Sequence, residues 1–432
     1  MRSFEMNTKA ITTPAKIAVL IVVVVIAAVA GYFLISPTGT TSMSQTTTAA
    51  ATTAAATTQQ PINIGIIAPL TGIGANHGAA MVNGFKLAAE EINGQGGVLG
   101  RQLNLIVQDE DDSSDMAGKA ADLLISQYNV FAILGHYWTG GVSATMGYKP
   151  MPIDIQTAAS ADFLMNNVIT DPTDYNGMFR VGFSDSSMAF LAANWVTQII
   201  NAKTVWYVAE DYQWAHEVHD FLLNSTSSNG VTIAAADYFQ SSTTDYTAEV
   251  AKIALAKPDA TVVIMSGTNG IYFYKQYAAN PATKKIPIFS VYTEFQRADI
   301  VQSTETAQPG STQYIGTGIQ FDYTNKTAAY EAKYYQTYGV QSDLTTDGRA
   351  YDALYVLANA INSAGVLDKN AVIAALEKTD YVGVCGIIRF TARHDLVYGP
   401  GGAIGMIWQW VNTSAQIVWP KQLANATWVP PQ

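Results

Sequence analysis

The segment INIGIIA at residues 62–68 decides the fold class of this chain. It is an apolar run of strand length, and a Gly-rich turn and a helical pattern follow it directly. Five similar runs recur along the chain, namely LNLIV (103–107), VFAIL (130–134), TVWYV (204–208), TVVIM (261–265) and IPIFSV (286–291). Short apolar runs that alternate with helical patterns are typical of buried parallel strands. We therefore predict an α/β protein with doubly wound parallel sheets.

The segments between the runs carry apolar residues at helical spacing. The first predicted helix has a face made of Met81, Phe85, Ala88, Ala89 and Ile92, and the second has Met116, Ala120, Leu123 and Leu124. The alternation pauses before residue 204 and then resumes, and a long helix is predicted over 348–364. This order indicates two Rossmann-like lobes, with the chain crossing between them.

The N-terminus carries a candidate membrane anchor. Residues 17–35 are 19 residues without a charge, close to the roughly 20 that a helix needs to cross a bilayer. Arg2, Lys9 and Lys16 precede this stretch and the next basic residue is Lys86, so residues 1–16 are predicted to be cytoplasmic and the remainder extracellular or periplasmic. A cleaved signal peptide is the alternative. Residues 36–60, rich in Thr and Ala, are predicted to be a linker.

Composition excludes several classes of protein. The chain has 34 acidic residues against 23 Lys plus Arg, a net charge of −11, which disfavours a nucleic-acid-binding face. The single cysteine, Cys385, permits neither an internal disulfide nor a cysteine zinc site. Four sequons, which permit glycosylation of an extracellular domain, start at Asn224, Asn325, Asn412 and Asn425.

The string TGIGANHG at 71–78 is reminiscent of a dinucleotide loop. Its third glycine falls one place late, and Asp109 lies 31 residues beyond Gly78, whereas the ribose-binding acid of such loops lies about 20 residues on. We therefore predict a tight strand-to-helix turn, whose backbone N–H groups could receive a carboxylate.

Two polar motifs invite metal hypotheses. The acidic run DEDDSSD at 109–115 could bind calcium, but it lacks EF-hand spacing, and a solvated strand end with Asp112 or Ser114 capping the next helix is the simpler interpretation. His216 and His219 lack the HExxH spacing and an evident third ligand. There is also no G-x-S-x-G elbow. We therefore predict no enzyme activity, no metal and no cofactor.

Polar and aromatic residues gather after the predicted strands, where open α/β sheets bind ligands. These residues are His77, His136, Tyr137, Trp138, Thr139, Trp214, 266–269 and Glu294. Together they predict a polar cleft with apolar walls. The alternative is that each of them faces solvent separately.

Several motifs in order resemble the extracytoplasmic solute-binding proteins of branched-chain amino acid ABC transporters. They are INIGIIAPLTGIGANHG (62–78), EEINGQGGVLGRQLNLIVQDEDD (90–112), AILGHYWTGG (132–141), GRAYDALYVLANAI (348–361), GIIRFTARHD (386–395) and IVWP (417–420). The resemblance implies a type I periplasmic-binding-protein fold, which closes on a ligand between two hinged lobes. It also implies docking on an ABC permease driven by an ATPase.

The resemblance further implies three crossings between the lobes. We place lobe 1 at 61–184 and 319–380, and lobe 2 at 185–318 and 381–425. Composition breaks put the crossings near 182–187, 316–321 and 379–386.

Ligand-binding residues follow from the same motifs. The family's hydroxyl after the GH-x-x stretch corresponds to Thr139, an aromatic position to His77, and a common tyrosine to Trp214. The acid that pairs with a ligand ammonium corresponds to Glu294. Thr157 and Ala159 lie in the next hydroxyl-rich turn, Trp138 lies beside Thr139, and Thr268 or Asn269 replaces another frequent tyrosine.

The departures from the family pattern leave the ligand open. Branched-chain amino acids, amides, urea-like solutes, small aromatic acids and a sugar stacked on Trp138 and Trp214 are all compatible with these residues. A membrane-tethered transport receptor is the favoured function. The alternatives are the ligand-sensing ectodomain of a signalling system and a surface protein that has lost its ligand.

Overall fold

The computed structural model describes residues 59–111, 113–265, 268–291, 314–317, 324–399, 402–403, 405–411 and 414–431. The predicted anchor at 17–35, most of the linker and Glu294 lie outside these ranges. Among the described helices, none combines the length and apolar character that a bilayer span requires. Of the sequon asparagines, Asn224, Asn325 and Asn425 are exposed, and Asn412 lies outside the described residues.

The first sheet contains five described strands, all parallel, in the order β2-β1-β3-β4-β5. Their bounds are β1 Ile62–Ala68, β2 Leu103–Asp109, β3 Ala132–Gly135, β4 Ile153–Gln156 and β5 Met178–Arg180. Ile66 and Ile67 of β1, whose side chains point to opposite faces of the sheet, are both fully buried, as expected for a central strand covered on both faces. The predicted parallel sheet is therefore confirmed.

The second sheet has seven described strands in the order β14-β13-β10-β9-β8-β6-β7. They are β6 Thr204–Glu210, β7 Thr232–Phe239, β8 Ala260–Ile264, β9 Ile288–Val291, β10 Tyr314–Thr317, β13 Ile407–Val411 and β14 Ser414–Trp419. The strands from β7 to β10 are parallel, whereas β13 and β14 join the edge antiparallel. A separate hairpin pairs β11 Tyr381–Val382 with β12 Ile387–Ile388.

Helices follow most of the strands, as doubly wound sheets require. In the first group they are α2 Ala75–Gly94, after the short turn Gly72–Gly74, α3 Ser114–Asp122 with its π-helical end Leu123–Gln127, α4 Thr139–Thr145, α5 Asp162–Thr170 and α6 Pro172–Tyr175. In the second group they are α7 Asp185–Asn194 with its end Trp195–Ile199, α8 Gln213–Ser227, α9 Thr247–Ala256, α10 Thr268–Ala279 and the short turn Thr283–Lys285. Three later helices are α12 Thr327–Tyr338, α13 Asp347–Ala364 and α14 Lys369–Leu376.

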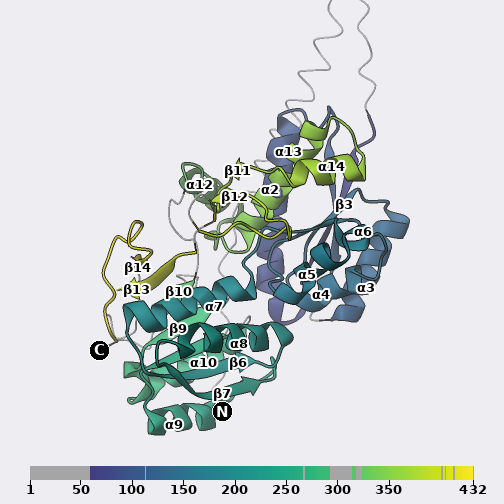
Figure 1. Ribbon diagram of the computed structural model, residues 1–432. Helices are drawn as coiled ribbons and strands as arrows, with labels where there is room; N and C mark the ends of the chain where they lie inside the picture. The colour runs from purple at the N-terminus through teal and green to yellow at the C-terminus, as the bar shows by residue number, and fades with distance from the viewer. Residues whose placement is uncertain are drawn as a thin grey trace, which may run out of the picture. The chain divides into compact units, whose positions relative to one another are not determined.

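The later helices return to the first group. Helix α13 lies beside α2 and α14 (Figure 1). The approach to α2 is close because position 84 is glycine, where a Cβ atom would lie 2.1 Å from the carbonyl oxygen of Asp347. Tyr351 on α13 donates a hydrogen bond of 2.5 Å to Glu91 on α2. The long helix predicted over 348–364 is confirmed, and it belongs with the first sheet although it follows the second in sequence.

The segment predicted as the third crossing contacts α13. Asp352 on α13 accepts hydrogen bonds from the backbone N–H groups of Val384 and Cys385 at 2.8 and 2.9 Å, which attaches the β11–β12 hairpin to that helix. These contacts bind part of the predicted segment 379–386 to a helix that lies beside α2. The three crossings and the lobe boundaries at 184/185, 318/319 and 380/381 stay predictions.

Three details of the predicted helices and strands were wrong. Met116 is exposed, and α3 instead buries Ala117, Ala120 and Ala121, with Leu124 following in its π-helical end. Ser113, rather than Ser114, caps α3, because its hydroxyl accepts the N–H of Met116 at 3.3 Å. Strands β4, β5 and β7 were also missed, since β4 and β5 are only 4 and 3 residues long.

Candidate functional site

Nearly all the predicted ligand-binding residues follow the carboxyl ends of parallel strands. His77 lies in α2 after β1, Trp138 and Thr139 follow β3, and Thr157 and Ala159 follow β4. In the second group, Trp214 follows β6, and Thr268 and Asn269 open α10 after β8. We call these segments the strand-end region. Glu294 lies outside the described residues, and so does the side chain of Thr268.

Aromatic side chains from three strand ends meet in this region. His77 stacks on Tyr137 with ring centroids 5.0 Å apart, and Trp138 meets the same tyrosine edge-on at 4.7 Å. Trp138 also contacts Tyr212, which precedes α8, at 6.2 Å. The indole is 9% exposed, and its N–H has no hydrogen-bond acceptor among the described residues. The cluster therefore supplies an apolar wall with one unused donor.

A buried ionic cluster holds the loop that carries Trp138. The imidazole of His136 lies 3.1 Å from Asp154 and 3.4 Å from Glu110, and all three side chains are fully buried. The other oxygen of Glu110 accepts the backbone N–H of Tyr137 at 2.6 Å. Burial alone would lower the pKa of His136, but the charges and hydrogen bonds of Asp154 and Glu110 raise it to about 10. His136 thus belongs to the support of the site, and sequence analysis gave it no such role.

The turn after β4 uses its own donors internally. The hydroxyl of Thr157 donates to the carbonyl oxygen of Gly135 at 3.3 Å, and its backbone N–H donates to the same oxygen at 2.9 Å. The N–H of Ala159 donates to the carbonyl oxygen of His136 at 3.1 Å. Thr139 is the first residue of α4 and is half-buried. Thr157 and Ala159 would have to break these internal hydrogen bonds to bind a ligand carboxylate. Thr139 is therefore the predicted residue best placed to bind one.

The second group contributes one ordered pair. Asn269, which is buried, donates from its amide to Glu210 at the end of β6 over 2.6 Å. Trp214 is also buried, in the first turn of α8. Glu210 and Tyr212 were not among the predicted residues, although both follow or end an apolar strand, which is the signal that identified Trp214.

The glycine-rich segment 71–78 allows close packing between α2 and the turn that precedes it. At Gly78 a Cβ atom would lie 1.7 Å from the carbonyl oxygen of Pro69, so only glycine lets α2 approach the turn. Asp109 then closes the turn by accepting the N–H of Leu70 at 2.7 Å and the hydroxyl of Thr71 at 2.6 Å. Burial raises the pKa of Asp109, but these hydrogen bonds outweigh it and lower the pKa below its usual range.

The other reactive side chains have ordinary partners. His216 pairs with Asp211 at 2.9 Å and His219 with Asp220 at 3.5 Å. Within the described ranges no three His, Cys, Asp or Glu residues are grouped as metal ligands. Cys385 is buried and donates to the carbonyl oxygen of Leu344 at 3.1 Å, and burial raises the pKa of its thiol well above the usual range.

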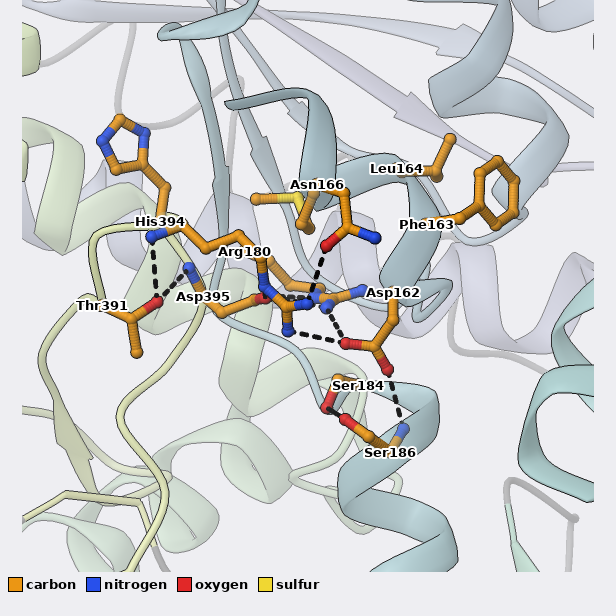
Figure 2. Close-up of polar contacts among 12 residues, drawn as sticks. Asp162, Phe163, Leu164, Asn166, Arg180, Ser184, Ser186, Thr391, His394 and Asp395 are labelled. Carbon is orange, nitrogen blue, oxygen red and sulfur yellow. Dashed lines mark hydrogen bonds and ion pairs between the residues drawn. The ribbon is translucent and has the colours of Figure 1, made fainter. Parts of the chain in front are cut away.

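An ionic cluster at the end of β5 joins several segments (Figure 2). Arg180 lies 2.6 Å from Asp395 and 3.6 Å from Asp162, the first residue of α5. Arg393 lies 2.7 Å from each of these two carboxylates. Asp162 also accepts the backbone N–H of Ser186 on α7 at 2.8 Å. Two further carboxyl groups, Asp185 and Glu217, lie beside this cluster. Sequence analysis assigned none of these residues to a site, although Arg393 and Asp395 belong to the quoted motif GIIRFTARHD.

A cavity of about 660 Å³ lies next to the same cluster. Its lining includes Phe190, Leu191, Leu396, Tyr398 and Trp419. None of the predicted ligand-binding residues lines it. We therefore do not assign the solute to this cavity.

Comparison with known proteins agrees with this geometry. Residues 61–399 match the family of periplasmic binding proteins. An amino acid binding protein from Pseudomonas aeruginosa is 25% identical over 255 residues, which cover 58% of this chain and 64% of that protein. The match thus spans less than two thirds of the relative.

Two solved structures show the same fold. The branched-chain amino acid transporter substrate binding protein LivJ from Streptococcus pneumoniae, in complex with isoleucine, superimposes with a TM-score of 0.71 at 24% identity, covering 83% of this chain and 100% of that one. A solute binding protein of an ABC transporter from R. palustris, in complex with benzoate, gives 0.70 at 17% identity, covering 83% and 95%. These relatives are binding proteins, which is consistent with the prediction of no enzyme activity. The fold, the strand-end region and the match over residues 61–399 together show that this chain belongs to the periplasmic binding protein family.

Proposed function

We propose that this protein is an extracytoplasmic receptor that captures a small polar solute, most favourably a branched-chain or related amino acid, and delivers it to an ABC permease with its ATPase. The observation that carries the proposal is that the described ligand residues predicted from sequence follow the carboxyl ends of parallel strands in both sheets, in a chain of this family. Open α/β sheets bind ligands at that edge.

The ligands of the two solved relatives share a carboxylate, since isoleucine and benzoate both carry one. In this chain the carboxylate would meet the hydroxyl of Thr139 and the unused N–H of Trp138. Thr157 and Ala159 would contribute only by exchanging their present bonds to Gly135 and His136. The ring cluster around Trp138 would cover the apolar part of the solute.

The family implies an extracytoplasmic location, and the tether is a separate proposal. Residues 17–35 would anchor the chain in the membrane and 36–60 would link it to the lobes. Removing residues 1–60 should then release a soluble protein that still binds its solute. A truncated protein that aggregated, or that lost every ligand response shown by the full chain, would contradict the tether.

The ligand class is tested by a thermal-shift screen of the purified full-length chain against amino acids, amides, aromatic carboxylates and sugars. A solute present at 100 times its Kd should stabilise the protein by about 2.7 kcal/mol. We expect branched-chain amino acids to give the largest shift. A shift with aromatic carboxylates or sugars alone would change the proposed solute, and no shift with any class would contradict a receptor.

A further inference from the structure

The cavity beside the Arg180 cluster has no part in the proposed function. Its volume of about 660 Å³ falls within the range of about 300–1,000 Å³ that is typical of small-molecule sites. Its described lining comes from α5, the first turns of α7, the described part of 391–405, and Trp419 at the end of β14. The cavity is therefore large enough for an organic molecule, which parts of both groups of elements would contact.

The backbone donors at the start of α7, on one wall of the cavity, have acceptors of their own. The N–H groups of its first three residues donate to the carbonyl oxygen of Ser160 at 3.0 Å, to the carboxylate of Asp162 at 2.8 Å and to the hydroxyl of Ser184 at 3.1 Å. The hydroxyl of Ser187 donates to the carbonyl oxygen of Ser184 at 2.7 Å. Helix N-termini bind anions through free N–H groups, so this wall offers no anion site.

The charged side chains of the lining, Arg393 and Asp395, also have partners. The three guanidinium nitrogens of the arginine lie 2.7 Å from Asp162, 2.7 Å from Asp395 and 3.0 Å from Asn166. Asp395 in turn lies 2.6 Å from Arg180 (Figure 2). A charged ligand would have to replace one of these ion pairs and lose its own hydration. The cavity therefore favours a neutral molecule.

The remaining wall is apolar and rich in aromatic rings. Phe190, Tyr398 and Trp419 line it together with Ile169, Leu191 and Leu396. Phe190 meets Trp419 edge-on with ring centroids 6.0 Å apart. Phe190 and Ile169 are each 55% exposed, so both carry apolar surface that a ligand can remove from water. Aromatic rings attract one another at centroid distances of about 4.5–7 Å, so a ring in the cavity would have partners.

We propose that this cavity is a second ligand site of the protein and takes a neutral, apolar molecule that contains an aromatic ring. The inference goes beyond the proposed function and does not rest on it, because the cavity shares no residue with the predicted solute site. The proposed solute carries charged groups, whereas the charges of this cavity are paired and the N–H groups on its α7 wall are used. The two sites therefore select opposite kinds of ligand.

The test titrates the purified full-length chain with three probes by calorimetry. Indole is a neutral ring compound, indole-3-carboxylate is the same ring with a negative charge, and 1-octanol is a neutral apolar chain without a ring. Ala392→Trp adds a large side chain to the lining, and Phe190→Ala removes a ring from it. Phe163→Ala is the matched control, because Phe163 is also an exposed phenylalanine but lies outside the lining. Ala392 and Phe190 are both exposed, and thermal melts report whether each variant is folded.

We expect indole to bind the wild-type chain saturably. Ala392→Trp should abolish this binding, because the new side chain takes the space of the probe. Phe190→Ala should weaken it by about 2-fold to 12-fold, the effect of losing one aromatic pair, and Phe163→Ala should leave it unchanged. Indole-3-carboxylate should bind this cavity about 10-fold or more weakly than indole, since its charge has no free donor there. Binding of 1-octanol should also be weaker, because it has no ring.

Several results would overturn the site. Indole binding that persists unchanged in both Ala392→Trp and Phe190→Ala would place the probe elsewhere on the protein. Equal weakening in Phe163→Ala would show a general effect of losing an exposed ring. Tighter cavity binding of 1-octanol or of indole-3-carboxylate would reject the neutral ring compound as the ligand class, and no saturable indole binding would reject the site. If Ala392→Trp does not fold, Phe190→Ala and its control decide the question.

Discussion

Two groups of buried charge lie near the strand ends, and they are built in opposite ways. In the first, His136 lies between Glu110 and Asp154, and Glu110 also receives a backbone N–H. In the second, Asp185 and Glu217 lie together, and the nearby guanidinium groups are bound to other carboxylates. We call the first cluster satisfied because a cation lies between its two carboxylates, although Oδ1 of Asp154 has no hydrogen-bond partner among the described residues. We call the second unsatisfied because its carboxyl groups outnumber the cations beside them.

The largest expected effect is on the satisfied cluster. His136→Ala would leave Glu110 and Asp154 buried without their shared cation, which should lower the free energy of unfolding by about 3–5 kcal/mol. Urea unfolding of the full chain measures this. A loss below about 1 kcal/mol would mean that the cluster does not support the fold.

The unsatisfied cluster should respond with the opposite sign. Asp185→Asn removes a buried ionisable group and adds an amide N–H beside Glu217, so we expect the empty protein to gain about 1–3 kcal/mol at pH 8. Because the pKa of Asp185 is raised in the folded state, the gain should shrink toward pH 4. Destabilisation at pH 8 would show that the carboxylate already has a structural partner.

The pH dependence of stability sharpens the same comparison. The folded pKa of His136 is about 10, against 6.5 for the free side chain. Its contribution to the free energy of unfolding is therefore fully present below pH 6.5 and is lost as the pH rises through 10, at no more than about 1.4 kcal/mol per pH unit. Unfolding curves at pH 6.5, 8 and 10 should show this decline, and His136→Ala should lack it.

The smallest effect on stability is expected at Thr157. Its hydroxyl makes only a long hydrogen bond of 3.3 Å to the carbonyl oxygen of Gly135. That oxygen already accepts the backbone N–H of Thr157. Thr157→Val should therefore change the free energy of unfolding by less than about 1 kcal/mol. If Thr157 exchanges this bond for the solute, leucine affinity should still fall; unchanged affinity would remove Thr157 from the proposed site.

Sequence patterns predicted the fold where apolar runs were long. The runs at 62–68 and 204–208 correspond to β1 and the start of β6, and the helix at 348–364 corresponds to α13. Strands β4 and β5 were not predicted, because they are short and because Asp154 and Arg180, two buried charged residues, interrupt their apolar pattern. Their charges are stabilised by partners that local periodicity cannot reveal.

The candidate site was predicted in position but not in its partners. The strand-end rule located Trp138, Thr139 and Trp214 because it needs only the order of strands and loops. It could not pair His136 with Glu110, 26 residues away, or Arg180 with Asp395, 215 residues away. Asp185 and Glu217 were missed for the same reason, since an unsatisfied carboxyl group is visible only once its neighbours are known.

The most direct test of the account is the binding of L-leucine to the wild-type chain at pH 7. Calorimetric titration in phosphate and in Tris, buffers with different ionisation enthalpies, measures it together with any change in the number of bound protons. The groups that interact with the carboxyl group of Asp185 are Ser160, Arg180, Glu217 and Tyr207. The account predicts saturable leucine binding, and if that binding alters the protonation of the Asp185–Glu217 pair, the heats in the two buffers should differ less in Glu217→Gln. Titrations without saturable heat in either buffer would contradict the account.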